Sequence, residues 1–332
     1  MKAFEYCVFI GRFQPFHLGH YELFKEALRL ADTVLVVIGS YNKAPDIENP
    51  WSAEQREEMI RSALTKEELD RVKFLYVRDS WYVHNRWLTD VQQLVFDATD
   101  GCDDSKICLI GASNDFPQWK FFFQKNLDHM PHATAVRGLY FTHDVAYKNH
   151  VHDNVSTFLE KFKTTDAFKN LKGTFDYLRD YAKAWEGAPF PVTFVTVDSI
   201  VVKSGHVLVV RRKGNPGKGQ IALPGGFLNQ LETTMDGALR ELKEETGIKL
   251  DKKELEAAIT DQKVFDYPKR SLRGRTITHA FLIDLGSGPL PVVKGSDDAD
   301  KAWWMSLSEF ATREYDFFED HFHIISHFVN KF

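Results

Sequence analysis

Apolar residues in the first 110 positions alternate between short β-branched runs and segments with helical spacing. Two apolar runs, at 6–10 and 33–38, enclose a segment from Tyr21 to Leu30 in which apolar residues recur every three or four positions. This order predicts a strand, a helix and a second strand, the crossover from which parallel sheets are built. Further strands are expected at 72–77 and 106–110, with a helix between them. The first half is therefore predicted to be an α/β domain, a parallel sheet with helices on both faces.

The second half of the chain has a different pattern. Helical spacing runs from Val155 to Trp185 and is then broken by the sequence EGAPFP at 186–191, because proline cannot continue a helix. Strand patterns follow at 192–202 and 206–211, and one amphipathic helix is predicted over 234–246. A length of 332 residues also favours about two domains. We expect domains at 1–186 and 187–332.

Composition and charge exclude several classes of protein. The apolar share of 43% and the charged share of 27% are ordinary for a globular protein in water. A net charge of -5 gives no basic face, so a nucleic-acid partner is not expected. No apolar run reaches the ~18 residues of a membrane span. Three dispersed cysteines and a start without a signal peptide indicate a cytoplasmic protein. Composition leaves a homo-oligomer open.

The segment GRFQPFHLGH, from Gly11 to His20, lies where the first strand gives way to the first helix. Ligands of open α/β sheets bind outside the carboxyl ends of strands, and a helix N-terminus offers N–H groups to phosphate. His17 and His20 are three positions apart and share one helical face. Nucleotidyl transfer needs positioning and charge cancellation on a polyphosphate, which two imidazoles and Arg12 can supply. Such a histidine pair alone is more often structural, so the ten-residue context carries this interpretation.

That segment resembles the His-x-Gly-His signature of nucleotidyltransferases, in the form used by nicotinamide-mononucleotide adenylyltransferases. The stretches at 49–56, 85–88 and 133–137, and the G-x-x-x-D element at 111–115, are similar to further motifs of that family. The resemblance implies a Rossmann-like domain whose substrates are ATP and nicotinamide mononucleotide. It implies that His17, His20 and Arg137 are catalytic. It also implies substrate contacts from Gly11, Arg12, Phe13, Trp51, Arg56, Asn85, Trp87, Gly111, Asp115 and Thr134.

Two departures from the family pattern and two alternatives accompany this prediction. His132 stands where a serine is common, and Asn114 and Pro117 replace polar residues near Asp115. Trp87 fits a core aromatic of an amphipathic helix as well as a ring that stacks on pyridine. The phosphate acceptor could instead be nicotinate mononucleotide, or a pantetheine or lipid head-group phosphate, although the motifs at 49–56 and 85–88 argue against the latter two.

The second half contains a sharper motif. Gly226, Glu232 and the sequence RELKEETGI from Arg240 to Ile248 fulfil every position of the Nudix box, G-x5-E-x7-R-E-U-x-E-E-x-G-U. On the predicted helix Glu241, Glu244 and Glu245 fall at i, i+3 and i+4, so three carboxylates converge on one face. Like charges at this spacing repel one another unless a cation shares the site. Carboxylate oxygens suit Mg²⁺ or Mn²⁺, and we expect these three glutamates to be both catalytic and metal-binding.

Clustered glutamates most often form a solvated helix face, but the glycines at 225–226 and the arginine at 240 favour a metal-dependent active site. The resemblance to Nudix hydrolases implies an α/β/α sandwich, substrate contacts from Gly225 and Gly226, and an orienting role for Arg240 on a glutamate. The stretch 295–304 resembles a loop of ADP-ribose-cleaving relatives and could supply the base that activates water, or be a solvated turn. Both halves together resemble bacterial bifunctional adenylyltransferase/Nudix hydrolases. The remaining alternatives are a non-catalytic ADP-ribose sensor and a hydrolase of another nucleoside diphosphate derivative.

Overall fold

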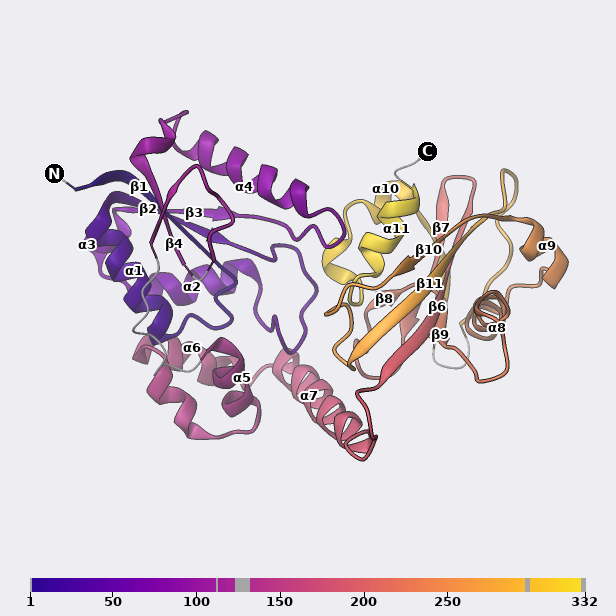
Figure 1. Ribbon diagram of the computed structural model, residues 1–332. Helices are drawn as coiled ribbons and strands as arrows, with labels where there is room; N and C mark the ends of the chain where they lie inside the picture. Colours follow the sequence, from indigo (N-terminus) through magenta and orange to yellow (C-terminus); the bar gives the residue numbers. More distant parts are fainter. Residues whose placement is uncertain (1, 112, 123–131, 296–298, 330–332) are drawn as a thin grey trace. The chain divides into compact units, whose positions relative to one another are not determined.

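The computed structural model describes residues 2–111, 113–122, 132–295 and 299–329. The chain forms two compact units, Met1–Lys172 and Gly173–Phe332 (Figure 1). The division lies inside helix α7 (Asp166–Ala184), earlier than the boundary after residue 186 that the proline-rich segment suggested. Local packing explains the difference, because the last turns of α7 contact the first strand of the second unit: the rings of Tyr181 and Phe194 lie 5.7 Å apart between centroids.

The first unit is built on a five-stranded sheet with the order β3-β2-β1-β4-β5. Every pairing in this sheet is parallel. The predicted crossover is confirmed, and the carboxyl ends of the strands meet at one edge of the sheet. The strands are β1 (Phe4–Gly11), β2 (Ala31–Ile38), β3 (Val72–Tyr76), β4 (Ile107–Ile110) and β5 (Lys120–Phe122). The helices are α1 (Leu18–Leu30), α2 (Ala53–Ala63), α3 (Lys66–Leu69), α4 (His84–Ala98), α5 (Ala133–Phe141) and α6 (Asp153–Phe162), with 3-10 turns η1 (Asp104–Lys106) and η3 (Val145–His150).

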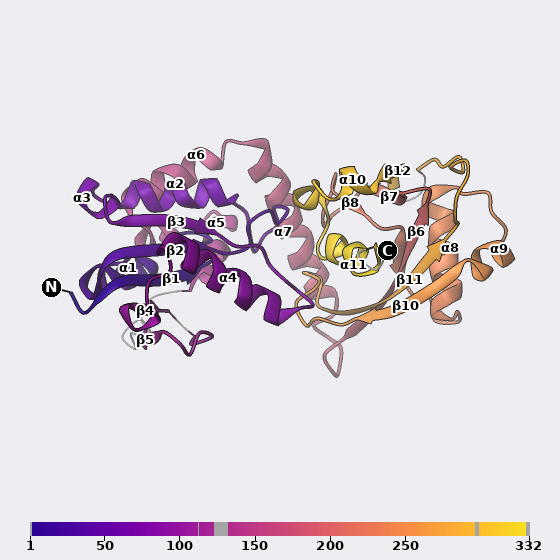
Figure 2. The same cartoon turned by 90° about the horizontal axis from the view of Figure 1, so that it is seen from above.

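Helices cover both faces of this sheet, as predicted. Val8 and Leu35 belong to the same buried cluster as Val91 and Val95 of α4. Neighbouring residues of a strand point to opposite faces, and on the other face the ring of Phe9 lies 6.5 Å from His20 of α1. Figures 1 and 2 agree that α2 and α4 lie on opposite sides of the strands. The first unit is thus a Rossmann-like three-layer arrangement.

The second unit contains a mixed sheet with the order β10-β11-β6-β7-β12, to which β8 and β9 add through β7 and β6. The pairing of β11 with β6 is parallel, and the other pairings on this path are antiparallel. The strands are β6 (Thr193–Lys203), β7 (His206–Arg212), β8 (Ile221–Ala222), β9 (Gly225–Phe227), β10 (Ile259–Phe265), β11 (Arg275–Asp284) and β12 (Ala299–Ser306). The helices are α8 (Thr234–Thr246), α9 (Lys252–Ala257), α10 (Leu307–Phe310) and α11 (His321–Val329), with a 3-10 turn η4 (Glu314–Asp316).

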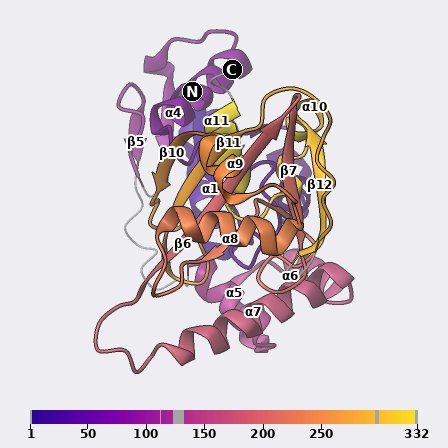
Figure 3. The same ribbon diagram turned by 90° about the vertical axis from the view of Figure 1, so that its right-hand side faces the viewer.

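Two helices enclose the second sheet. Leu239 and Leu242 of α8 pack in one buried cluster with Val201 of β6, while Phe328 of α11 lies 6.0 Å from Phe265 of β10 between ring centroids. Figures 1 and 2 place α8 and α11 on opposite sides of the strands, and Figure 3 shows α8 lying across the near face of the sheet. This is the predicted sandwich. None of the helices within the described ranges is both long and apolar enough to cross a membrane.

Candidate active sites

The first site begins where β1 ends and α1 starts. His17 is the N-cap of α1, and its Nδ1 accepts the backbone N–H of His20 at 3.3 Å, while Nδ1 of His20 accepts the N–H of His17 at 3.3 Å. The two imidazoles stack with centroids 3.7 Å apart. Because Nδ1 is an acceptor in both rings, a neutral ring must carry its proton on Nε2. The capping pattern therefore sets one tautomer for both histidines.

Burial keeps these rings uncharged. It lowers the pKa of His17 to about 4, helped by the charges of His132, His150 and Arg137. Burial, followed by the charge of His17, also holds the pKa of His20 well below its ordinary value. At neutral pH both side chains are thus hydrogen-bond donors through Nε2 and not cations. Donors of this kind suit a phosphate that must be bound and then released.

Arg137 supplies the positive charge beside the histidines. It lies on α5, is 5% exposed, and donates from Nη1 to the carbonyl of Gln14 at 2.6 Å and from Nη2 to Oγ1 of Thr134 at 3.3 Å. Burial and the charge of Arg12 lower the pKa of Arg137 to about 10, which leaves it charged at neutral pH. The structure thus brings Thr134 and Arg137 to the loop that leads into α1. His132, the departure noted in the sequence, is the N-cap of α5 without a side-chain cap bond.

Two residues expected to contact substrate are buried next to the loop after β1. Arg56 is 1% exposed and donates to the carbonyls of Arg12, Gly39 and Ser40. It therefore joins the loops after β1 and β2. Trp51 is buried against Tyr140. The sequence could not separate these roles, because the same motif accommodates an arginine that binds backbone carbonyls and an arginine that binds phosphate.

The site also depends on a residue that was not singled out. Gln14 is 2% exposed; its side chain donates to the carbonyl of Trp51 at 2.9 Å and accepts the N–H of Trp51 at 3.2 Å. Its own carbonyl accepts Arg137. Gln14 thereby couples the loop after β1 to the segment before α2 and to α5. Its place inside the segment GRFQPFHLGH was the available signal, but nothing local reveals the distant partners.

The other expected contacts lie along the same edge of the sheet. Gly11 ends β1, and Phe13 is a buried residue with φ of 53° whose ring lies 5.1 Å from His20. Arg12 is exposed and pairs with Glu48 at 3.8 Å. Gly111 directly follows the end of β4, and Asp115, four residues further on, is exposed and accepts a hydrogen bond from Ser113 Oγ. Asn85 is exposed in the first turn of α4, and Trp87 in the same helix is half-buried, with its ring centroid 5.8 Å from that of Phe116.

The second site is formed by β9 and α8, and its two glycines are required by close approach. A Cβ on Gly226 would lie 2.5 Å from Oε1 of Glu241, and one on Gly225 would lie 2.2 Å from the carbonyl of Val197. The N–H of Gly225 donates to Oε2 of Glu245 at 3.0 Å. The predicted helix is confirmed over Thr234–Thr246, and Gly247 caps it with φ of 58°. Strand β9 therefore lies directly on two of the three predicted glutamates, Glu241 and Glu245.

Arg240 organises the carboxylates around it. Its Nε and Nη2 donate to both oxygens of Glu232 at 2.9 and 2.7 Å. Its Nη1 donates at 2.8 Å to Glu241 and at 2.8 Å to Glu244. The sequence predicted that Glu241, Glu244 and Glu245 converge, but Arg240 lies between the first two. Accordingly, no group of three acidic, histidine or cysteine side chains within the described ranges has the arrangement that surrounds a metal ion.

The chemistry of the donors still fits a divalent cation. Burial, with the charges of Glu241 and Asp198 added to it, raises the pKa of Glu245 to about 8, although the N–H of Gly225 and the charge of Arg212 act in the opposite direction. Burial likewise raises the pKa of Glu241. Buried carboxylates that repel one another are stabilised by a hard cation, which prefers oxygen ligands. Glu241 and Glu245 are the residues that would hold it, and Glu244 lies at the margin, 45% exposed at its side chain.

Two features near this site need separate description: a buried aspartate that the sequence analysis did not name, and the stretch 295–304, which is described only in part. Asp198 of β6 is buried beside Gly225 and accepts the hydroxyl of Thr278, and burial raises its pKa. It sits in an apolar strand pattern, where sequence alone gives no sign of its neighbours. In the stretch expected to supply a base, Ser296, Asp297 and Asp298 lie outside the described residues, whereas Asp300 is exposed on β12.

His321 holds the segment that leads into β9. Its Nδ1 accepts the N–H of Leu223 at 2.9 Å, and burial lowers its pKa to about 3. The unfolded chain binds this proton near pH 6.5, whereas the folded chain does not. The contribution of neutral His321 to stability is therefore present above pH 6.5 and is lost as the pH falls towards 3.

We expect the free energy of unfolding of the second unit to fall by about 2 kcal/mol between pH 7 and pH 5 on account of His321. Urea unfolding of wild-type protein and of His321→Asn at both pH values checks this. Asparagine offers an acceptor near the position of Nδ1 but does not titrate, so the difference between the two proteins isolates this residue. Equal pH dependence in both would contradict the assignment.

The two sites together define a class of protein: a nucleotidyltransferase-like unit joined to a Nudix unit. Residues 8–164 match the family model described as Cytidylyltransferase-like, and residues 192–328 match the NUDIX domain. The nicotinamide/nicotinic acid mononucleotide adenylyltransferase of Acinetobacter baylyi is 31% identical over 52% of this chain and 94% of its own. The ADP-ribose pyrophosphatase of Methanocaldococcus jannaschii is 38% identical over 37% of this chain and 67% of its own.

One solved structure is similar along the whole chain. The bifunctional NMN adenylyltransferase/ADP ribose pyrophosphatase of Francisella tularensis, complexed with AMP and a manganese ion, is 36% identical, covers 99% of both chains and has a TM-score of 0.94. The chain belongs to this family of bifunctional NMN adenylyltransferase/ADP-ribose pyrophosphatases.

Proposed function

We propose that the first unit transfers the adenylyl group of ATP to nicotinamide mononucleotide, giving NAD and pyrophosphate. The observation that carries this proposal is the stacked pair His17 and His20, neutral and fixed in one tautomer at the start of α1. Their Nε2–H groups and the buried charge of Arg137 bind and orient the triphosphate. The phosphate of the mononucleotide attacks the α-phosphorus of ATP, and pyrophosphate leaves; no protein nucleophile takes part.

The second unit hydrolyses ADP-ribose to AMP and ribose 5-phosphate. Here Glu241 and Glu245, which lie against Gly226 and Gly225 of β9, would hold a divalent cation, Mg²⁺ or Mn²⁺. When bound, the cation polarises the phosphoryl group and lowers the pKa of water. Arg240 positions Glu232 and Glu241 through the bonds described above. The fully matched box, with its contacts in place, favours a hydrolase over a sensor that only binds ADP-ribose.

One assay tests both activities. Purified protein is incubated with Mg²⁺ and ATP plus either nicotinamide or nicotinate mononucleotide, and separately with ADP-ribose, and the products are separated by chromatography. We expect NAD and pyrophosphate from the first mixture, and AMP and ribose 5-phosphate from the last. Comparison of the two mononucleotides decides the acceptor. Binding of ADP-ribose without cleavage would leave only the sensor alternative for the second unit.

Arg137→Lys is expected to raise the KM for ATP about tenfold, because lysine keeps the charge but loses the fork of donors that joins phosphate, Thr134 and the carbonyl of Gln14. Steady-state kinetics at varied ATP concentration measure this. Arg179→Lys is the matched control. Arg179 is an exposed residue of α7 that pairs with Asp176, and this variant should retain wild-type kinetics. Unchanged ATP kinetics in Arg137→Lys would remove Arg137 from the site.

A further inference from the structure

A closed ring of contacts in the first unit runs through Gln14, Trp51, Tyr140 and Arg137. The side chain of Gln14 forms two hydrogen bonds with the backbone of Trp51, one to its carbonyl at 2.9 Å and one from its N–H at 3.2 Å. The ring of Trp51 packs on that of Tyr140, with centroids 5.7 Å apart. Tyr140 lies in α5 with Arg137, whose Nη1 donates to the carbonyl of Gln14 at 2.6 Å. The contacts thus return to the residue at which they began.

This ring of contacts is buried throughout. All four of its residues belong to the interior of the unit, and Trp51 also packs edge to face on Phe162 of α6, at 5.9 Å between centroids. A buried hydrogen bond is costly to lose, because its partner is then left unsatisfied away from water. The position of Gln14 is therefore set by residues 37 and 123 positions away along the chain.

The carbonyl of Gln14 in turn sets the direction of Arg137. A guanidinium is planar and its donors form a rigid fork, so two bonds to different nitrogens orient the whole group. The second bond is the one from Nη2 to Oγ1 of Thr134, at 3.3 Å. Gln14 also lies in the same short loop as His17. One segment thus places both the arginine and the first histidine, and donors placed before a ligand arrives lower the ordering cost of binding.

We propose that Gln14 is a positioning residue of the transferase site, whose bridge to Trp51 holds Arg137 in the orientation that binds the triphosphate of ATP. This inference rests on the proposed adenylyl transfer. Gln14 is 2% exposed, so its side chain acts on ATP through Arg137 and not by contact. The effect of Gln14 is therefore specific to ATP and depends on the arginine fork.

Gln14→Met tests this proposal in the full chain, because methionine has a similar length but no group that replaces the two bonds to Trp51. We expect the KM for ATP to rise about tenfold, the size of effect that loss of one or two buried hydrogen bonds gives. The KM for nicotinamide mononucleotide should stay within twofold of wild type. The dissociation constant of ATP, measured by calorimetry, should rise with the KM. Gln14→Glu keeps an acceptor for the N–H of Trp51 and should have an intermediate effect.

A double-mutant cycle with Arg137→Lys separates positioning from general damage to the fold. Lysine has no fork whose direction could be set, so adding Gln14→Met to Arg137→Lys should raise the KM for ATP less than twofold further. Independent effects of the two substitutions would multiply instead. A structural role alone would also raise the KM for both substrates. Urea unfolding shows whether Gln14→Met is folded, and if it is not, Gln14→Glu takes its place in the cycle.

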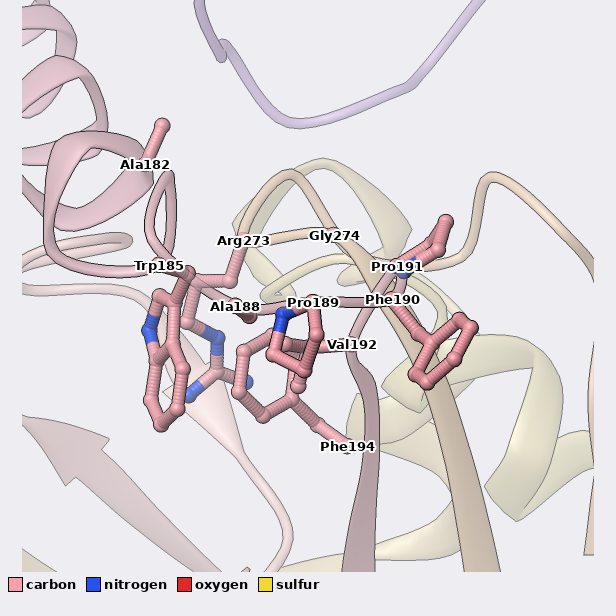
Figure 4. A pocket seen from close by; sticks show the side chains of 10 residues that line it. All are labelled: Ala182, Trp185, Ala188, Pro189, Phe190, Pro191, Val192, Phe194, Arg273 and Gly274. Carbon is pink, nitrogen blue, oxygen red and sulfur yellow. The ribbon is translucent and has the colours of Figure 1, made fainter.

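Two controls accompany the cycle. Gln93→Met changes an exposed glutamine of α4 that bonds Asp97 and should retain wild-type kinetics. ADP-ribose hydrolysis by Gln14→Met should also be unchanged. The second unit, with the carboxylates of α8 and a cavity of about 350 Å³ at the end of α7 (Figure 4), contains none of the substituted residues.

A KM and a dissociation constant for ATP within twofold of wild type in Gln14→Met would overturn the proposal. Equal increases in the KM for both substrates would do the same, as would a tenfold increase that persists beside Arg137→Lys. Failure of the proposed function looks different, because the wild-type protein would then form no NAD. In that case weaker ATP binding by Gln14→Met, lost in the Arg137→Lys background, would still support the positioning role.

Discussion

Glu241→Gln is expected to lower the rate of ADP-ribose hydrolysis about 10³-fold or more, and Glu245→Gln should have an effect of the same order. Each substitution keeps the size of the side chain but removes a charge that holds the cation, whose stabilisation of a phosphoryl transition state is several kcal/mol. Glu241 and Glu245 are the carboxylates of α8 that lie against Gly226 and Gly225 of β9. Hydrolysis should also stop in excess EDTA.

Two controls separate metal chemistry from damage to the fold. Adenylyl transfer by the same protein should be unchanged, because every residue assigned to that reaction lies in the first unit. Glu256→Gln removes a glutamate of α9 that pairs with Lys252 at 3.5 Å and should leave hydrolysis intact. Robust cleavage by Glu241→Gln, or in EDTA, would rule out this carboxylate site.

His17→Ala or His20→Ala is expected to lower adenylyl transfer about 10²-fold, the usual effect of removing one preorganised donor to developing charge. Since both rings are neutral well below pH 7, their contribution should not change between pH 6 and pH 8. ADP-ribose hydrolysis by the same variants should be unaffected. Near-normal adenylyl transfer in both variants would contradict the catalytic role assigned to His17 and His20.

These histidines also cap a helix, so alanine removes structure as well as chemistry. Loss of a cap commonly costs about 1 kcal/mol of stability. His17→Asn separates the two effects: asparagine can accept the N–H of His20 in place of Nδ1, but it has no Nε2 donor. We expect His17→Asn to unfold like the wild type in urea and to transfer adenylyl groups as poorly as His17→Ala. Recovery of activity in His17→Asn would mean that capping alone matters.

The sequence predicted the parts of this molecule that depend on short-range pattern. The helix at 234–246 and the crossover around α1 were confirmed because amphipathic spacing and cap residues act within a few positions. Contacts between distant segments were beyond such patterns. The carbonyls bound by Arg56 lie up to 44 residues away, and Arg270 and Asp320 are separated by 50 residues. A short stretch of sequence does not show which distant residues such side chains contact.

The same limit applies to the side chains around the predicted site. Helical spacing places Glu241 and Glu244 on one face, but it cannot show that Arg240 donates to both of them. The position of the unit boundary inside α7 has a similar origin. Proline marks where a helix must stop, whereas the division between compact units depends on which core the helix packs against, here through Tyr181 and Phe194.

The reciprocal caps of α1 make two amide protons into reporters of the transferase site. The backbone N–H of His17 is held by the ring of His20, and that of His20 by the ring of His17. Either amide can exchange with solvent only when its bond opens, and opening unlocks the tautomer that presents Nε2–H to phosphate. Hydrogen exchange at these two positions therefore measures how much of the time the histidine pair is assembled, before any nucleotide is added.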